Sequence, residues 1–165
     1  MSTAVLIAST LRRVIRPALA SLLLAAAPAV FAQATDHRMV FPQDLKWADV
    51  PSLPPGAKIS VIEGPMNEAV PFTVRLRLPA DYRIPAHWHP AIERVTVLSG
   101  TFFMGVGDTL DVRKGMGLTP GAMMIMQPKT AHFAWTQGEV EIQLHGLGPW
   151  GVTYVNPADD PRKSR

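Results

Sequence analysis

The sequence contains no cysteine, which excludes disulfide bonds, thiol nucleophiles, thiolate zinc sites and iron–sulfur clusters. It also contains no Gly-x-Ser-x-Gly segment, the turn that exposes the nucleophile in many serine hydrolases. Any metal ion bound by this chain must therefore be held by histidine and carboxylate side chains. The chain has five histidines and 13 Asp and Glu residues to supply them.

Acidic residues are absent from the first 34 positions, which carry Arg12, Arg13 and Arg16. The whole chain has 16 basic and 13 acidic residues, so the remainder has 16 less three, or 13, of each sign. A body without net charge lacks the basic surface that phosphate backbones require. We therefore expect no nucleic-acid partner.

Residues 1–34 have the pattern of a secretory signal peptide. The three arginines precede an apolar stretch, Ala18–Val30, and small residues at Ala32 and Ala34 mark the expected cleavage region. The stretch is shorter than the roughly 20 residues needed to span a bilayer. We expect a periplasmic or secreted protein with no membrane span once the leader is removed. The Arg12-Arg13 pair leaves both the general and the twin-arginine export routes open.

Long segments with helical periodicity are absent after residue 35, whereas short runs with two-residue alternation recur between Gly and Pro residues. This pattern predicts an all-β fold of about ten short antiparallel strands, closed as a sandwich or barrel. The predicted strands are Lys58–Glu63, Phe72–Leu78, Ala86–His89, Arg94–Leu98, Phe102–Val106, Gly117–Thr119, Met123–Gln127, His132–Thr136, Val140–His145 and Gly151–Val155.

The mature chain divides into three predicted parts. Residues 35–56 form a proline-rich N-terminal arm, residues 57–156 the barrel, and residues 157–165 a polar C-terminal tail. The arm and the absence of net charge are compatible with a homodimer in which arms or edge strands pair between subunits.

Two histidines and a glutamate stand at a spacing that suits metal binding. His87 and His89 are two residues apart, so on a strand both imidazoles point to one side and Trp88 to the other. Glu93 follows four residues later, past Pro90, where the chain can turn back toward the same ion. Three neutral imidazoles and one carboxylate, if a further histidine joined them, would suit Mn, Fe, Ni, Co, Cu or Zn.

The run His87-x-His89, three residues, Glu93, six residues and Gly100 resembles the first motif of the cupin family. His132, with Gly121 eleven residues before it, resembles the histidine of the second motif. The chain departs from the family pattern at turn positions: Asp81, Pro128, Thr130, Ala131 and Thr136 stand where other residues are usual.

The resemblance implies an RmlC-like double-stranded β-helix, that is, a jelly-roll barrel, with one divalent transition metal held by His87, His89, Glu93 and His132. It implies a small-molecule substrate and an oxidoreductase of the dioxygenase type, with a lyase or isomerase equally permitted by the ligands. A binding or sensing module that captures a small ligand or metal without turnover is the alternative. The fold and the ligands do not select the reaction.

His145 has two interpretations. It shares one strand face with Glu141 and Gln143, which could line the cavity, whereas Ile142 and Leu144 on the opposite face are the better candidates to point inward. We therefore expect His145 to lie outside the cavity, with an acid–base role inside it as the alternative.

Overall fold

The computed structural model describes residues 37–163, so the predicted signal peptide lies outside the described residues. The strands are β1 Ala48–Asp49, β2 Lys58–Glu63, β3 Pro71–Leu78, β4 Arg83–Trp88, β5 Glu93–Ser99, β6 Phe102–Val106, β7 Met116–Leu118, β8 Met123–Met126, β9 His132–Thr136, β10 Val140–Leu147 and β11 Thr153–Tyr154. Three short 3-10 turns are η1 Pro42–Asp44, η2 Val112–Lys114 and η3 Pro157–Asp159. No helix in this part of the chain is long and apolar enough to cross a membrane.

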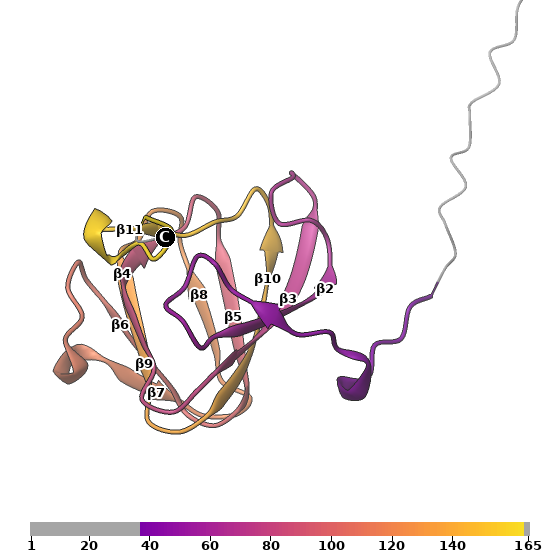
Figure 1. The fold of residues 1–165 in the computed structure, drawn as a ribbon, viewed down its shortest axis with the longest axis horizontal. Coiled ribbons are helices and arrows are strands. Elements are labelled where there is room, and N and C mark those ends of the chain that lie inside the picture. The colour runs from indigo at the N-terminus through magenta and orange to yellow at the C-terminus, as the bar shows by residue number, and fades with distance from the viewer. Residues whose placement is uncertain (1–36, 164–165) are drawn as a thin grey trace, which may run out of the picture. The chain divides into compact units, whose positions relative to one another are not determined.

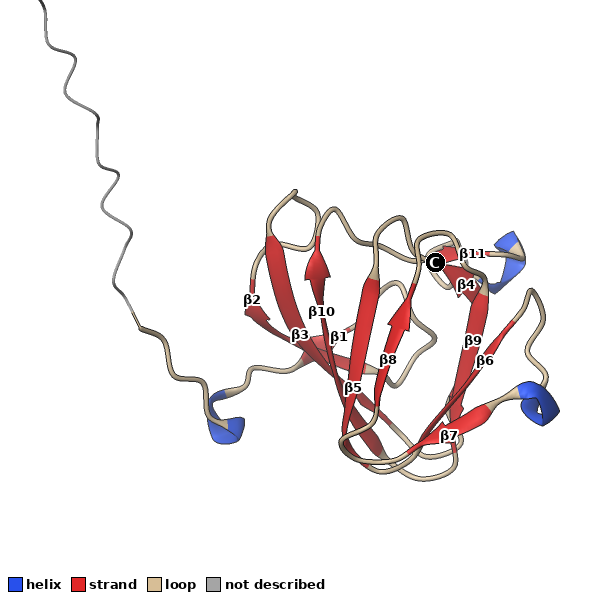
Figure 2. Cartoon of the chain, turned by 180° about the vertical axis from the view of Figure 1, so that it is seen from behind, coloured by secondary structure: helices blue, strands red, loops and turns tan. Residues whose placement is uncertain are grey.

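The strands form two antiparallel sheets that face each other (Figures 1 and 2). One has six strands in the order β1-β2-β3-β10-β5-β8, and the other has five in the order β11-β4-β9-β6-β7. The chain crosses from one sheet to the other several times; for example, β4 lies in the smaller sheet and the next strand, β5, in the larger. The predicted all-β jelly-roll architecture is confirmed.

The core lies between the sheets and follows from the alternation in the sequence. In β3 the even-numbered residues from Phe72 to Leu78 are buried, while Arg75 and Arg77 point outward. The neighbouring strand β10 repeats the pattern and buries Val140, Ile142 and Leu144. Each such side chain contributes roughly 1.5–3 kcal/mol when removed from water.

The outward face of these strands is polar, and its side chains form ion pairs and hydrogen bonds with one another. Glu141 accepts from Arg75 at 3.3 Å and from Arg77 at 3.0 Å, and Arg75 also reaches Gln143 at 3.2 Å. The guanidinium of Arg77 lies 4.1 Å from the centre of the Trp47 ring.

Most predicted strands match the observed bounds within a few residues, and β2, β6 and β9 match them fully. The largest difference is at β4, which begins at Arg83, three residues before the predicted Ala86, and ends at Trp88. Pro85 removes a backbone donor and hid this strand from the pattern. The structure accommodates it with a register shift between Ile84 and His87, the kind of irregularity at which proline is tolerated in sheets.

Turns near the two motifs contain residues with positive φ angles, and one of these residues, Asp81, departs from the cupin pattern. Asp81 has φ 56° and Lys129 has φ 60°, so both adopt the left-handed region without being glycine. Gly100, which ends the first motif, has φ 74°, and a Cβ there would lie 2.3 Å from the Glu139 carbonyl oxygen. The turn between β5 and β6 therefore needs a glycine at this position.

The arm preceding β2 is tied to the barrel by two tyrosines. Tyr154 donates to the carbonyl of Ser52 at 2.8 Å, and Tyr82 donates to the carbonyl of Pro54. Val50 and Leu53 of the arm are buried in the core. Within the predicted proline-rich arm, Ala48–Asp49 forms strand β1, which pairs with β2.

A small second core lies on the far face of the five-stranded sheet. Phe133 and Trp135 of β9 alternate with the inward-facing His132 and Ala134, and Trp135 stacks on Phe103 at 5.2 Å between ring centres. A loop of residues 107–115 packs over these rings through Leu110 and Gly115. The strand that supplies His132 is thus packed on both faces.

We expect Gly115→Ala to destabilise the protein by about 1–3 kcal/mol, because the new Cβ would lie 1.9 Å from Cη2 of Trp135, a ring that its stacking partners hold in place. Urea unfolding monitored by circular dichroism measures the loss. Gly138→Ala is the matched control, since nothing lies within 4 Å of a Cβ there. Equal stability of the two variants would contradict the packing of the loop on Trp135.

Candidate metal centre

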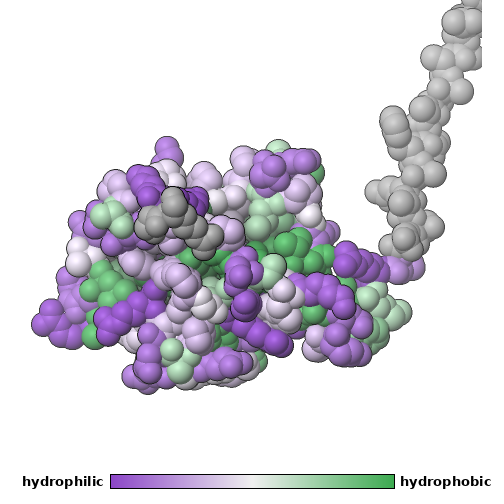
Figure 3. All heavy atoms as spheres, viewed as in Figure 1, coloured by the Kyte–Doolittle hydropathy of each residue, from purple (hydrophilic) through white to green (hydrophobic). Residues whose placement is uncertain are grey.

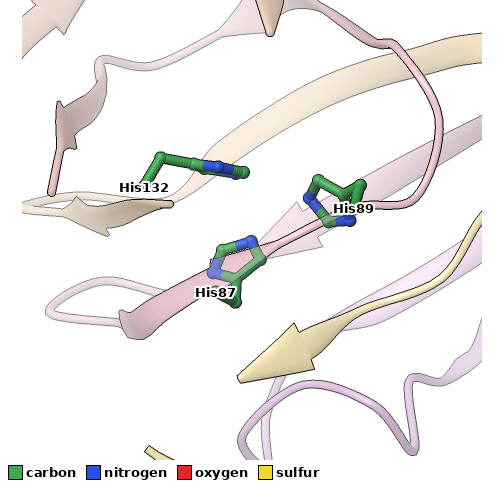
Figure 4. A group of neighbouring side chains, drawn as sticks. All are labelled: His87, His89 and His132. Carbon is green, nitrogen blue, oxygen red and sulfur yellow. The ribbon is translucent and has the colours of Figure 1, made fainter. Parts of the chain in front are cut away.

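Three histidines converge between the sheets (Figure 4). His87 in β4 and His132 in β9 are cross-strand partners, with ring centres 4.3 Å apart. His89 follows the end of β4, and its ring centre lies 4.9 Å from that of His87 and 5.1 Å from that of His132. One ligand atom from each of the three lies within 4.8 Å of the others. The structure therefore brings together the three histidines that the sequence proposed.

The register shift in β4 aims His87 into the barrel. Ile84 and His87 both line the interior although they are three residues apart, whereas a regular strand would place them on opposite faces. The irregularity at Pro85–Ala86 supplies the extra residue, and the carbonyl of Pro85 then accepts a hydrogen bond from His87 at 2.7 Å.

Glu93 reaches the cluster from the opposite sheet. It is the first residue of β5, and the segment after His89 carries the chain across from the smaller sheet. Its Oε1 lies 3.3 Å from Nε2 of His89, and its Oε2 lies 3.5 Å from Nε2 of His132. Glu93 thus contacts two of the three imidazoles. The group whose ligand atoms all lie within 4.8 Å of one another contains the three histidines without Glu93.

Backbone carbonyls fix the tautomer of each ring. The Nδ1 atoms of His87, His89 and His132 lie 2.7, 2.8 and 2.9 Å from the carbonyl oxygens of Pro85, Gly151 and Thr130, respectively. A carbonyl oxygen only accepts, so each Nδ1 donates its proton and each neutral ring keeps a lone pair on Nε2. This is the arrangement that orients metal-binding histidines.

The centre lacks a positive charge to balance its carboxylate. All four residues are at most 5% exposed, and the ion-pair contacts of Glu93 in the described part of the chain are those to His89 and His132. With protons on Nδ1, the Nε2 lone pairs face the carboxylate oxygens, which are also acceptors. Nε2 of His89 is buried and has no hydrogen-bond partner. A cation placed among acceptors that face one another in a buried space would compensate them.

Burial favours the neutral form of His87 and His89. Burial, together with repulsion from His132 and His89, lowers the pKa of His87 to about 3. Burial also lowers the pKa of His89, against the opposing attraction of Glu93. For Glu93, burial acts to raise the pKa, but the neighbouring histidines, His132 first among them, outweigh it and hold the pKa below its ordinary value. The neutral forms of His87 and His89 and the ionised form of Glu93 are thus favoured, and these are the states that bind metal.

The four side chains stand at one end of a narrow apolar cavity. Its free space is about 30 Å³, measured as the volume open to the centre of a water molecule. Apolar residues from both sheets form the rest of its wall, among them Ile84, Val95, Met104 and Met124. A dry wall of this kind strengthens electrostatic interactions at the metal centre.

Trp150 is an aromatic residue at this site that sequence reasoning missed. Its ring stacks on His89 with 4.4 Å between ring centres and 18° between planes. It lies on the segment after β10, tied by its backbone N–H to the carbonyl of Met66 at 2.7 Å. No local pattern marks it, because the contact joins positions 61 residues apart and depends on the closed barrel.

The remaining histidines lie away from the centre. His145 pairs with Thr73 and Arg94 in neighbouring strands and shares the outward face with Glu141 and Gln143, while Leu144 lines the cavity. The alternative of a cavity role for His145 is thus not supported by its position. His37 is exposed.

No family model and no curated protein sequence matches this chain. Solved structures do match its fold. The polyketide cyclase RemF from Streptomyces resistomycificus superimposes with a TM-score of 0.63 at 15% identity, covering 78% of this chain and 92% of that one. A candidate acetylacetone dioxygenase from Methylibium petroleiphilum gives 0.59 at 17% identity, covering 78% and 88%.

A third similar structure is an RmlC-like cupin from Shewanella frigidimarina, with a TM-score of 0.50 at 18% identity over 67% of this chain and 91% of that one. At these identities the likeness concerns the fold alone. The fold of this chain is the cupin fold, as the spacing of its histidines and glutamate indicated.

We expect the metal-free protein to lose stability in acid. The His87 imidazole takes up a proton near pH 6.5 when unfolded and only near pH 3 in the fold. Between these values the unfolded state binds more protons, so the free energy of unfolding falls as pH falls, by about 1.4 kcal/mol per pH unit for such a group.

Urea unfolding of chelator-treated protein between pH 7 and pH 4 measures this slope. His87→Gln removes the titrating group, and we expect a shallower decline below pH 6.5 with no change of slope above it. A variant whose acid limb is as steep as that of the parent would show that His87 is not held neutral by the fold.

Proposed function

We propose that this chain binds one divalent transition metal through His87, His89, His132 and Glu93 and uses it as an oxidoreductase of the dioxygenase type on a small organic substrate. The observation that carries the metal site is the convergence of three buried imidazoles, each oriented by a backbone carbonyl, on a buried carboxylate with no Lys or Arg partner.

The donor set fits such an ion. Three imidazole nitrogens and one carboxylate oxygen suit Mn, Fe, Ni, Co, Cu or Zn rather than Ca or Mg, which prefer oxygen ligands. A bound ion of this class would polarise a substrate oxygen or take part in electron transfer to dioxygen. The unpartnered Nε2 of His89 supports the assignment, since a buried nitrogen without a partner is otherwise unfavourable.

The chain's own side chains supply the surroundings for that chemistry. The carbonyls of Pro85, Gly151 and Thr130 hold the rings in one tautomer. Trp150 packs flat on His89 and limits its movement. The apolar wall excludes water, so that a reactive substrate is kept from side reactions.

The similar structures bear on the reaction class. The similar structures include a polyketide cyclase and a candidate acetylacetone dioxygenase, which carry out different chemistry on one fold. The alternative of a binding or sensing module without turnover is favoured by one observation: the cavity at the four side chains holds only about 30 Å³ of free space.

We expect the purified full chain, dialysed against buffer, to retain about one transition metal ion per chain, measured by elemental analysis. His87→Ala, His132→Ala and Glu93→Ala should each lower the bound metal at least about tenfold, because each removes a ligand. His145→Ala is the matched control, a histidine on the outward face of β10, and should leave the metal content unchanged. Unchanged content in both His87→Ala and Glu93→Ala would overturn the site.

Turnover is tested by oxygen uptake. Metal-loaded protein is incubated with flavonols, small diketones including acetylacetone, and organic acids, and product formation is followed by mass spectrometry. We expect oxygen consumption matched to substrate loss for one class and its disappearance in His132→Ala. Fully metal-loaded protein that consumes no oxygen with any of the compounds would support the binding module instead.

A further inference from the structure

A second cavity lies between the N-terminal arm and the mouth of the barrel. Val50 and Leu53 of the arm form one side, Ile59 and Val61 of β2 another, and Met66 lies on the segment between β2 and β3. Its free space is about 170 Å³, several times that at the metal centre. We call it the arm chamber. Val61 is 51% exposed, so the chamber meets the surface at this residue.

The arm chamber and the metal cavity share a wall. The residues that line both are Leu53, Leu76, Leu144, Trp150 and Val152. Trp150 is the polar member of this wall, and its ring stacks on His89. A molecule held in the chamber therefore lies one side chain away from the candidate metal ligands.

Trp150 carries an unused hydrogen-bond donor. Its indole Nε1 is buried and has no hydrogen-bond partner among the described residues. Leaving a buried N–H unpaired costs about 1–3 kcal/mol, so natural proteins rarely retain one without a reason. Trp150 lines both cavities, so an acceptor on a molecule bound beside it would be the partner of this N–H once the ring turns toward it.

The chamber's wall restricts the chemistry of that molecule. None of its twelve lining residues is ionisable, and apart from the indole N–H its only polar side chain is Ser52, so a charged ligand would lose its hydration without gaining a partner. The volume compares with that of an engineered apolar cavity of about 150 Å³ that binds benzene. The chamber therefore has room for a ring or branched chain of about six carbons.

Apolar residues also come to the surface near the middle of the face drawn in Figure 3, bordered by polar ones. An uncharged organic molecule can approach such a surface without losing strong hydration.

We propose that the arm chamber binds the hydrocarbon part of the substrate and that the Trp150 indole N–H binds an uncharged oxygen of it, a carbonyl or hydroxyl, which sets the substrate class as small, apolar and oxygen-bearing. This proposal rests on the proposed function, because it takes the neighbouring cavity to be the reaction site. Trp150 is then a specificity-determining residue, and the arm forms part of the binding site.

The probes are cyclohexanone, toluene and cyclohexanecarboxylate, titrated by calorimetry or ligand-observed NMR into metal-free full chain. Cyclohexanone offers a ring and an acceptor, toluene a ring without an oxygen acceptor, and the carboxylate a ring with a charge. We expect cyclohexanone and toluene to bind and the carboxylate to bind at least about tenfold more weakly. No binding of either uncharged ring would overturn the proposal.

Trp150→Phe keeps an aromatic ring and removes the N–H. We expect it to weaken cyclohexanone binding about fivefold and to leave toluene binding unchanged, the pattern of one lost hydrogen bond. Retained toluene binding shows that the variant is folded. Equal losses for the two probes, or none for either, would overturn the role of the indole N–H.

Val61→Trp fills the mouth of the chamber without touching the metal cavity, and we expect it to abolish binding of both rings. Val112→Trp, at a similarly exposed valine that lines neither cavity, is the matched control and should bind both. Equal binding by the two variants would place the ligand elsewhere.

The two proposals fail in different ways. If the metal content falls in His87→Ala but the parent protein binds neither uncharged ring, the chamber proposal fails and the metal site stands. If the parent protein binds the rings but the histidine substitutions leave the metal content unchanged, the metal-site proposal fails and the chamber proposal stands. Normal metal content in Val61→Trp confirms that blocking the chamber has not damaged the centre.

Discussion

A buried carboxylate without a cationic partner is the constraint on which the site depends. Glu93 has one oxygen near His89 and the other near His132, and the Nε2 atoms that face it carry lone pairs. Such a group is costly in a dry interior, and proteins usually avoid it by pairing, by protonation or by binding a metal ion. Pairing with Lys or Arg is absent among the described contacts, and the pKa of Glu93 is held low rather than raised. The metal ion that we propose would compensate the charge.

The arrangement of strands in the barrel brings these side chains together. His87 and His132 meet because β4 and β9 are adjacent and in register, while Glu93 arrives only because the chain crosses to the other sheet directly after His89. The three rings are oriented by carbonyls of three separate segments. Neither sheet alone could build the centre, so its geometry is a consequence of closure.

Several features of this arrangement could be predicted from the sequence because they are local. The spacing of His87, His89 and Glu93 within seven residues identified three of the four side chains of the centre, and strand alternation predicted which faces are buried. The resemblance to a motif supplied His132. Features that depend on closure were not predictable: the register shift at Pro85, which aims His87 inward, and the stacking of Trp150 on His89. Proline also concealed the first half of β4, because it interrupts the alternation without ending the strand.

Stability and function oppose each other at the same four side chains. A fold optimised for the metal-free state would replace Glu93 and the imidazoles by apolar residues, as buried polar clusters of this kind are often neutral or unfavourable for stability. If the proposed metal ion binds the native state, its binding free energy adds to the stability of the fold. The packing of β9 on both faces, with Phe133 and Trp135 behind His132, holds this ring in position between the sheets.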